Sequence, residues 1–274
     1  MKNAPASFSN LTSEITAEYA GLSRQLQKFG RYALDHADVV ALETVTTIAE
    51  LADVQPSTIV RFAKAFGYDG FSDLQKVFRT RLMENTSSYR ERIHSLENDD
   101  RSGTASVLHA FADAGIESLE QLKQHAHPER MQQAIDIIRN AGDIHLLAQG
   151  RSYAVAHYLH YALSRLEIRS LLIDGAGGMM RHQVARVRPD DAVIAISFSP
   201  YTPVVAELVG HLADQGRKVI SITDSPLSPL ASRSAVSFEI NDGSEQAFRS
   251  LIAPICLAQS LVVGVGQALE QTRN

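Results

Sequence analysis

Short apolar runs alternate with helix-forming stretches from about residue 144 to the end of the chain. Each run has the length and composition of a buried strand, and each stretch after it repeats its apolar residues with helical spacing. Strands that alternate with helices pair in parallel, because each helix carries the chain back to the end of the sheet where the next strand begins. Apolar runs of this kind are typical of strands covered on both faces. The pattern therefore predicts a doubly wound, five-stranded parallel sheet of the α/β class.

Each strand of the predicted sheet is followed by a helix. The strands are expected at residues 144–150, 170–174, 192–197, 218–223 and 236–240, and the helices at 153–166, 178–187, 203–215, 227–233 and 246–270. In open sheets of this class, ligands bind beyond the carboxyl ends of the strands, where loops meet helix amino termini. Gly150-Arg151-Ser152 and the segment from Ser197 to Thr202 fall at such positions.

The residues before this sheet have a different character. From about residue 13 to residue 90 the pattern has helical periodicity with turns at glycine and proline, and the polar segment 97–104 is typical of a linker. A chain of 274 residues is long for one compact domain. We predict an all-α helix-turn-helix domain at residues 1–90, a linker and connecting helix at 91–125, and an α/β ligand-binding domain at 126–274.

Charge and composition exclude several classes of protein. The net charge of −5 gives no support to nucleic-acid binding by the whole surface, so any contact with DNA must be local. The single cysteine, Cys256, cannot form an internal disulfide and fits a reducing compartment. The first residues lack the apolar core of a signal peptide, and the apolar stretches elsewhere are too short or too interrupted to span a bilayer. We expect a cytoplasmic protein with no membrane partner.

Residues 47–66, TIAELADVQPSTIVRFAKAF, have the spacing of a helix-turn-helix. The small residue Ala49 lies where the two helices would cross closely, and Asp53 occupies the turn position that needs a left-handed backbone, which favours glycine and tolerates Asp. Pro56 suits the first turn of the second helix. In such motifs the second helix reads DNA in the major groove.

Polar and basic side chains are expected on the outward face of that second helix. Their types reach base edges and phosphates, and they are Gln55, Ser57, Thr58, Arg61 and Lys64. A further basic group could contact the DNA backbone or simply face solvent, and it consists of Lys76, Arg79, Arg81, Arg90 and Arg92. The alternative for the whole motif is a structural helical hairpin whose outer face is solvated.

Hydroxyl side chains gather at the predicted carboxyl edge of the sheet. Ser197, Ser199 and Thr202 follow the third strand, and Ser152 follows the first. Hydroxyls and backbone N–H groups at a helix amino terminus donate hydrogen bonds to an anion, and the helix dipole favours its charge. Thr202 before Pro203 would also serve as a helix cap, but capping does not explain the other three hydroxyls. We predict that this group binds a small molecule.

The predicted helix-turn-helix region and the predicted sheet region together resemble the RpiR family of bacterial transcriptional regulators, in which a helix-turn-helix domain precedes a sugar isomerase (SIS) domain. The resemblance extends over about residues 10–265 and rests on TIAELADVQPSTIVRFAKAFGYDGFSDLQ, LLAQGRSYAVA, AVIAISFSPYTPVV and VISITDSPLSPLA. It implies that the first domain binds a palindromic operator in double-stranded DNA. It also implies that the second domain binds a phosphosugar or related metabolite and forms homodimers or homotetramers.

In the SIS pattern, a serine after the first strand and a Ser-x-Ser-x-x-Thr after a middle strand converge on a phosphate. By position these are Ser152, Ser197, Ser199 and Thr202. Pro200 departs from the pattern, because glycine is usual there and proline removes a backbone donor. The effector could therefore be a smaller or unphosphorylated polyol. Arg151 could restore positive charge at the ligand site, and Glu245 is a further candidate for it.

The main expectation is a ligand-responsive transcriptional regulator that is not an enzyme and needs no cofactor. The alternative is an aldose–ketose phosphosugar isomerase with an added helical domain, which would need a base such as Glu245 or His182 near the sugar. A third interpretation is an oligomerisation protein without a ligand. His157 and His160 lie three residues apart on a predicted helix but lack an acidic or thiolate partner, so we expect no metal site.

Overall fold

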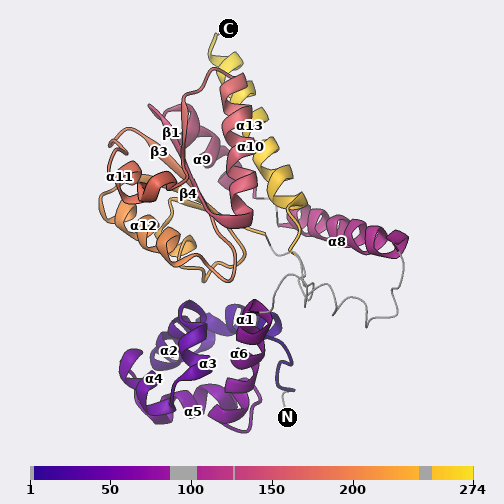
Figure 1. Ribbon diagram of the computed structural model, residues 1–274, viewed down its shortest axis with the longest axis vertical. Coiled ribbons are helices and arrows are strands. Elements are labelled where there is room, and N and C mark those ends of the chain that lie inside the picture. Colours follow the sequence, from indigo (N-terminus) through magenta and orange to yellow (C-terminus); the bar gives the residue numbers. More distant parts are fainter. Residues whose placement is uncertain (1–2, 87–103, 126, 241–248, 274) are drawn as a thin grey trace. The chain divides into compact units, whose positions relative to one another are not determined.

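The computed structural model describes residues 3–86, 104–125, 127–240 and 249–273, and the chain divides into two compact units. The described part of the first unit is helical, and the second contains the sheet together with the helices from residue 104 onward (Figure 1). The change in the sequence from helical periodicity to strand–helix alternation therefore corresponds to a change of unit.

The helical unit packs short helices around an aromatic core. Its elements are α1 (Phe8–Glu18), the 3₁₀ turn η1 (Tyr19–Gly21), α2 (Arg24–Asp35), α3 (Ala37–Leu42), α4 (Val45–Leu51), α5 (Pro56–Ala65) and α6 (Phe71–Thr86). Phe29 of α2 meets Phe62 of α5 edge to face, with 4.9 Å between ring centroids. The two helices approach this closely because Gly30 has no side chain, since a Cβ there would lie 3.0 Å from Phe62 Cε2. The ring pair thus fixes α5 on α2.

The second unit is built on a parallel sheet. Its strands are β1 (Ile144–Ala148), β2 (Ser170–Ile173), β3 (Ala192–Ile196), β4 (Lys218–Thr223) and β5 (Val236–Glu239). The strand order is β2-β1-β3-β4-β5, and every neighbouring pair is parallel. In this register Ile144 of β1 lies opposite Ser170 on one side and Ala192 on the other. The predicted α/β class and parallel five-stranded sheet are confirmed.

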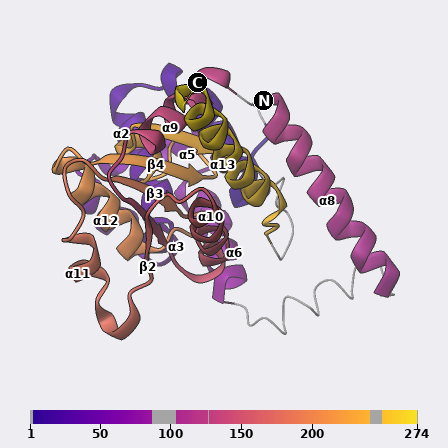
Figure 2. The same ribbon diagram turned by 90° about the horizontal axis from the view of Figure 1, so that it is seen from above.

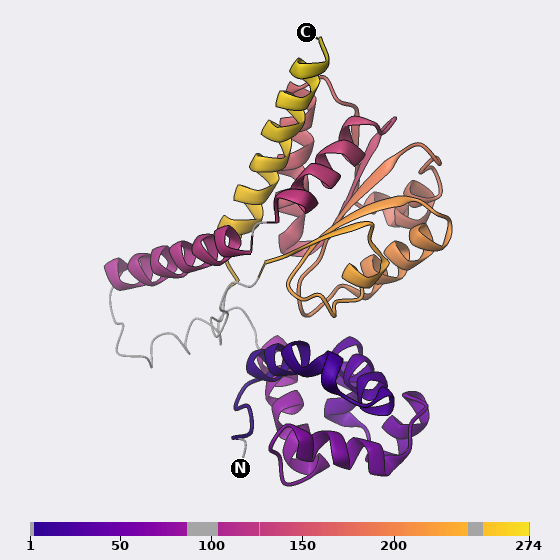
Figure 3. The same ribbon diagram turned by 180° about the vertical axis from the view of Figure 1, so that it is seen from behind.

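Helices cover both faces of the sheet (Figures 2 and 3). The covering helices are α9 (Pro128–Arg139), α10 (Tyr153–Arg165), α11 (Met180–Val184), α12 (Pro203–Asp214) and α13 (Ile252–Arg273). Helix α8 (Thr104–Gln124) contacts α13 and extends away from the sheet (Figure 3). Successive residues of a strand point to opposite faces. Accordingly Leu146 packs into the core that includes α9, α10 and α13, whereas Leu147 packs into the core that includes α11 and α12. Both faces of β1 are therefore buried, which explains why four of its five residues are apolar.

Helix α13 is long and apolar enough to cross a membrane by length and composition alone. Its segment Ile252–Gln271 has a mean hydropathy of 1.7, so the expectation that every apolar stretch is too short or interrupted is wrong for this helix. Ala258, Leu261 and Val265 are fully buried in the core that the helix shares with α9 and α10. Packing of this face accounts for part of its apolar character.

Two predicted helices of the sheet unit differ from the observed ones. Residues 227–233 form a helix only in the 3₁₀ turn η4 (Ala231–Arg233), and the Ser228 hydroxyl takes the Ala231 N–H that an α-helix over these residues would pair with a carbonyl. Ser225 Oγ accepts the N–H of Leu227, and Ser228 Oγ accepts that of Ala231. The helix predicted at 178–187 is shortened to α11. The predicted start of the last helix, at residue 246, lies outside the described residues.

Candidate nucleic-acid interface and effector site

The turn between α4 and α5 has the left-handed geometry that was predicted for a helix-turn-helix. Asp53 has a φ of 49°. Lys28 of α2 donates to the Asp53 carbonyl oxygen at 2.8 Å and also pairs with its carboxylate. The hydrogen bond and charge of Lys28 lower the pKa of Asp53. Ala49 and Ile59 are buried where α4 and α5 pack together. The turn is therefore stabilised by this packing and by the hydrogen bond from Lys28.

Helix α5 presents polar and basic side chains to solvent. The predicted residues that are exposed are Gln55, Ser57, Arg61 and Lys64. Thr58 is instead 1% exposed, so the prediction that it faces outward is wrong. Residues four apart share a helix face, and Thr58 lies one turn before the buried Phe62. Its hydroxyl accepts a 3.4 Å hydrogen bond from Arg61 Nη2 and thereby restricts that guanidinium.

The second basic group is only partly available to DNA. Lys76 and Arg79 are exposed on α6. Arg81 is 9% exposed, lies 4.6 Å above the centroid of the Phe8 ring and pairs with Asp38 at 2.8 Å, so placing it on an outer face is wrong. Arg81 thus connects α6 with α1 and α3. Arg90 and Arg92, also in this group, lie outside the described residues.

In the sheet unit, the direction of strand addition reverses between β1 and β3. The chain passes from β1 outward to β2, and from β3 in the opposite direction to β4. The loops that follow the two central strands therefore run apart, which is the position where open α/β sheets bind ligands. Gly150-Arg151-Ser152, which forms the 3₁₀ turn η2, follows β1, and the segment from Ser197 to Thr202 follows β3. The topology brings the two predicted segments to one switch point.

The hydroxyl residues of these loops have different environments. Ser152 and Ser197 are buried, whereas Ser199 and Thr202 are half-buried. Ser197 Oγ accepts a hydrogen bond from the Thr202 N–H at 3.3 Å. Thr202 is the N-cap of α12, but its own side chain makes no capping hydrogen bond. Helix capping therefore does not account for the Thr202 hydroxyl.

A carboxylate that sequence analysis missed lies against the same loop. Asp224 follows β4 and accepts hydrogen bonds from the Ser199 N–H at 2.9 Å, from the Tyr201 hydroxyl at 2.8 Å and from Arg249 Nη2 at 3.1 Å. The Arg249 guanidinium also lies 4.9 Å from the centroid of the Phe198 ring. The available signal was an acidic residue directly after a strand, at the edge where ligands bind.

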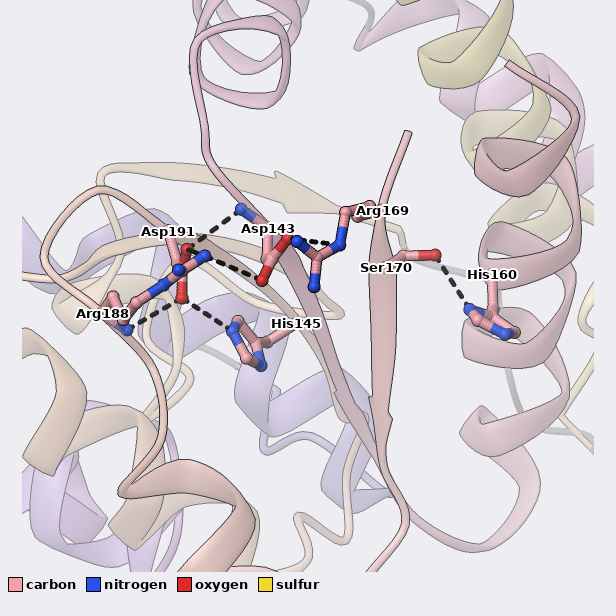
Figure 4. Close-up of polar contacts among 7 residues, drawn as sticks. All are labelled: Asp143, His145, His160, Arg169, Ser170, Arg188 and Asp191. Carbon is pink, nitrogen blue, oxygen red and sulfur yellow. Dashed lines mark hydrogen bonds and ion pairs between the residues drawn. The ribbon is translucent and has the colours of Figure 1, made fainter. Parts of the chain in front are cut away.

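The remaining sequence candidates lie in different places or outside the described residues. Arg151 is exposed in η2, His182 is exposed on α11, and Glu245 lies outside the described residues. His160 Nδ1 lies 2.8 Å from Ser170 Oγ, which connects α10 to β2 (Figure 4). Within the described part of the chain, no three His, Cys, Asp or Glu side chains are grouped to hold a metal ion.

A second polar cluster lies at the amino ends of β1 and β3 (Figure 4). His145 Nε2 lies 3.0 Å from Asp191 Oδ2, and both residues are buried. The Asp191 carboxylate also accepts the backbone N–H groups of Asp143 and Arg188, at 3.0 and 2.8 Å. Arg188 Nη2 bridges Asp143 and Asp191, and Arg169 pairs with Asp143 at 3.3 Å. The cluster ties the two central strands together at this edge.

Hydrogen bonds keep Asp191 ionised. Burial by itself would raise the pKa of its carboxyl group. The Arg188 N–H, the His145 imidazole, the Arg188 side chain and the Asp143 N–H outweigh burial and lower the pKa to about 2. At neutral pH the Asp191 carboxylate is therefore charged while it connects β1 and β3.

A cleft of about 720 Å³ lies beside this cluster, lined by residues of α9 and by Pro189, Asp190 and Lys218. It opens at the amino ends of the strands, away from the hydroxyl loops. Sheets of this class bind their ligands at the carboxyl ends instead. The candidate effector site is therefore the edge that carries Ser152 and Ser197, and the cleft is not assigned to it.

The chain thus belongs to the class of proteins in which a helix-turn-helix unit is followed by a doubly wound parallel sheet. Residues 9–88 match the family model described as the helix-turn-helix domain of the rpiR family, and residues 137–264 match that of the SIS domain. The chain belongs to the RpiR family of transcriptional regulators, as its motifs predicted.

Several known proteins are similar to this chain. The Bifunctional protein glk of Burkholderia mallei is 30% identical over 237 residues, which make up 85% of this chain and 36% of that protein. This chain therefore spans about a third of that relative's length. The uncharacterised HTH-type transcriptional regulator YbbH of Bacillus subtilis is 24% identical over 249 residues, 89% of this chain and 86% of YbbH.

A solved structure shares the fold. The Vibrio vulnificus NanR protein, complexed with ManNAc-6P, aligns over 96% of this chain and 94% of its own, with a TM-score of 0.59 and 20% identity. The RpiR transcription factor of Sphaerobacter thermophilus, solved as its sugar isomerase domain, aligns over 60% of this chain and 91% of its own, with a TM-score of 0.55 and 23% identity.

Proposed function

We propose that this protein binds operator DNA through its helical unit and responds to a carbohydrate-derived metabolite at the carboxyl edge of its sheet. One observation carries the proposal. The same chain exposes Arg61 and Lys64 on the second helix of a helix-turn-helix and places Ser152 and Ser197 at the switch point of a doubly wound sheet. Membership of the RpiR family supports the combination, and the NanR structure contains a sugar phosphate. A sugar phosphate or related compound is therefore the proposed effector class.

Helix α5 would lie in the major groove of the operator. Gln55 and Ser57 at its amino end can reach base edges, and the cationic Arg61 and Lys64 can reach bases or phosphates. Thr58 would act through Arg61, because its buried hydroxyl accepts a hydrogen bond from that guanidinium. Arg61 is thus partly pre-positioned before DNA binds.

A homodimer or homotetramer in the cytoplasm is part of this proposal. Helix-turn-helix proteins read two half-sites about one helical turn apart, which requires two copies of the helical unit. An effector would change DNA affinity only if it binds one arrangement of the paired units better than the other. Size-exclusion chromatography with light scattering measures the assembly directly.

We further propose that the protein is a regulator without catalytic activity. An isomerase needs a base within hydrogen-bond reach of the sugar. His182 is exposed on α11, and the other candidate base, Glu245, lies outside the described residues. Turnover of a sugar phosphate that is lost in His182→Ala or Glu245→Gln would support the isomerase instead.

Fluorescence anisotropy with promoter fragments near the gene tests the main proposal. The wild-type protein should bind a palindromic fragment at moderate salt, and Arg61→Ala with Lys64→Ala should bind it at least tenfold more weakly. Arg165→Ala, which removes an exposed arginine of the sheet unit, is the matched control. Absence of binding to any such fragment, with and without sugar metabolites, would contradict the proposal.

A further inference from the structure

Helix α8 is apolar along the side that packs against the sheet unit, but only part of that side is covered. Leu122 packs against the core, and Gly115 lies so close to α13 that a Cβ there would meet Ile252 Cδ1. Leu108 is two turns before Gly115 and therefore lies on the same side of the helix. It is nevertheless 68% exposed, because α8 extends away from the sheet (Figure 3). The beginning of α8, where Val107 is exposed as well, thus presents an apolar side to solvent.

A second exposed surface lies on α10 and α13. The two helices run side by side (Figure 1), and a Cβ at Gly266 of α13 would lie 3.4 Å from Leu166 at the end of α10. Within two turns before this contact, Tyr161 of α10 is 61% exposed and Val263 of α13 is 54% exposed. We call the outer side of these helices the α10–α13 face, and its exposed residues include His157, Tyr161, Gln259, Ser260, Val263 and Gln267.

The α10–α13 face carries no charged side chain along most of its length. Helix α10 has no Asp, Glu, Lys or Arg before Arg165, and α13 has none before Glu270. A helix surface that faces water normally carries charged residues opposite its buried side. Only 39% of the apolar segment Ile252–Gln271 is buried in the protein, so packing within the chain does not account for the rest. The face therefore has the composition of the core of a protein interface, where charged residues are depleted and tyrosine is enriched.

A second copy of this chain fits both surfaces. Two copies related by a two-fold axis present the same residues to each other, so a charged patch would meet its own charge, whereas an uncharged patch meets no repulsion. The apolar beginning of α8 extends beyond its own unit, and the two-fold axis would repeat its contact on the other copy. A lipid surface fits less well, because helices that lie on membranes are rich in Lys and Arg, and the segment Ile252–Gln271 has neither.

The size of the two surfaces agrees with a specific interface. At about 1.5 Å of length per residue and about 10 Å of width, α10, α13 and the projecting part of α8 present roughly 650 Å². Two copies would together bury roughly 1,300 Å², and specific interfaces bury about 1,200–2,000 Å². The α10–α13 face by itself would give a total of only roughly 1,050 Å², so the contact needs the beginning of α8 as well.

We propose that the α10–α13 face and the beginning of α8 form the contact between two copies of this chain. In this contact, α8 of each copy lies on the α10–α13 face of the other. The inference rests on the proposed function, since it supplies the contact that joins the two copies needed to read an operator. Helix α10 begins directly after Ser152, and α13 begins three residues after Arg249. The candidate effector site and the contact between copies therefore share these two helices.

Sedimentation velocity of the full-length protein tests the inference. The wild type should sediment as a dimer or a larger assembly. Val263→Glu and Leu108→Glu should each raise the dissociation constant between copies by about tenfold or more, because each places a negative charge in an uncharged contact. Both side chains are more than half exposed in the single chain, so both variants should fold, and thermal unfolding followed by circular dichroism checks this.

Leu42→Glu is the matched control, because Leu42 of the helical unit is also 68% exposed and receives the same charge. It should sediment as the wild type does. A monomeric wild type overturns the inference, as does an assembly that both variants leave intact or that Leu42→Glu disrupts equally. Wild-type binding to vesicles of phosphatidylcholine and phosphatidylglycerol that is lost in Val263→Glu would assign the face to a lipid surface and also overturns it. A dimer that depends on this face but binds no operator contradicts only the proposed function.

Discussion

His145 and Asp191 are 46 residues apart in the sequence and meet in the interior with 3.0 Å between Nε2 and Oδ2. His145 lies in β1, and Asp191 directly precedes β3, so the contact joins the two central strands at their amino ends. The hydroxyl loops follow the same two strands at their carboxyl ends. The sheet is therefore fastened at one edge and carries its candidate site at the other.

Replacing Asp191 with Asn should destabilise the sheet unit at neutral pH. The pKa of Asp191 is lowered from 3.8 to about 2, so the folded state favours the carboxylate. The resulting stabilisation is complete above about pH 4 and is lost as the pH falls towards 2. The shift corresponds to about 2 kcal/mol, because one pKa unit is about 1.4 kcal/mol.

Urea unfolding across this pH range measures the effect. The free energy of unfolding of the wild type should fall between about pH 4 and pH 2 more steeply than that of Asp191→Asn. Asp190→Asn, at the exposed neighbouring position, is the control and should follow the wild type. Equal pH dependence in wild type and Asp191→Asn would show that the cluster does not stabilise the fold.

Gly30→Val should destabilise the helical unit by about 1–3 kcal/mol, the usual cost of overpacking a core. Even the Cβ of a residue there would lie 3.0 Å from Phe62 Cε2, and branched methyl groups would push α2 away from α5. Gly21→Val is the control, since a Cβ at Gly21 meets no atom within 4 Å. Thermal unfolding followed by circular dichroism compares the two, and equal midpoints would contradict the assigned packing.

Removing the charge of Lys64 or Arg61 should weaken operator binding and reduce its salt dependence. Each phosphate contact contributes a slope of roughly −0.9 in a plot of log affinity against log salt concentration. We expect Lys64→Ala to lower the magnitude of the slope by about 1 if it contacts phosphate, and Arg61→Ala to relax base preference as well. Anisotropy titrations at several salt concentrations measure both, and unchanged slopes in both variants would rule out α5 as the DNA-contacting helix.

Removing the hydroxyl of Ser197 should mainly lower stability, whereas removing that of Thr202 should mainly abolish the response to the effector. Ser197→Ala removes the acceptor of the half-buried Thr202 N–H, which should cost about 0.5–1.5 kcal/mol of stability. Thr202→Ala removes a hydroxyl that makes no capping bond, so stability should change by no more than about 0.5 kcal/mol, while the response to the effector is lost. Chemical denaturation and effector-dependent operator binding separate these effects. Thr202→Ala with an intact response would remove Thr202 from the site.

Periodicity predicted the sheet well because both of its faces are buried. A strand such as β3, Ala192–Ile196, is apolar at every position, and no competing local interaction disturbs it. The helix predicted at 227–233 failed because Ser225 and Ser228 hydrogen-bond nearby backbone groups, which hydrophobic spacing does not register. Thr58 was misplaced because a polar residue type was taken to face solvent, whereas its spacing from Phe62 puts it on the buried stripe.

The candidate site was predicted in its hydroxyls but not in its acidic partner. Ser152, Ser197, Ser199 and Thr202 were found because they follow strands in a recognisable pattern. Asp224 and Arg249 come from two other parts of the chain, and only the strand order shows that Asp224 lies beside the loop after β3. The boundaries at residues 90 and 125 and the binding role of each predicted residue stay predictions.

The switch point between β1 and β3 has a consequence for how such proteins diversify. The sheet is secured by its apolar faces and by the ion pairs at its far edge, so none of that framework depends on which compound is sensed. A change of the compound that is sensed therefore requires only the exchange of a few side chains in the loops after β1 and β3. The sheet and the helix-turn-helix unit can stay the same.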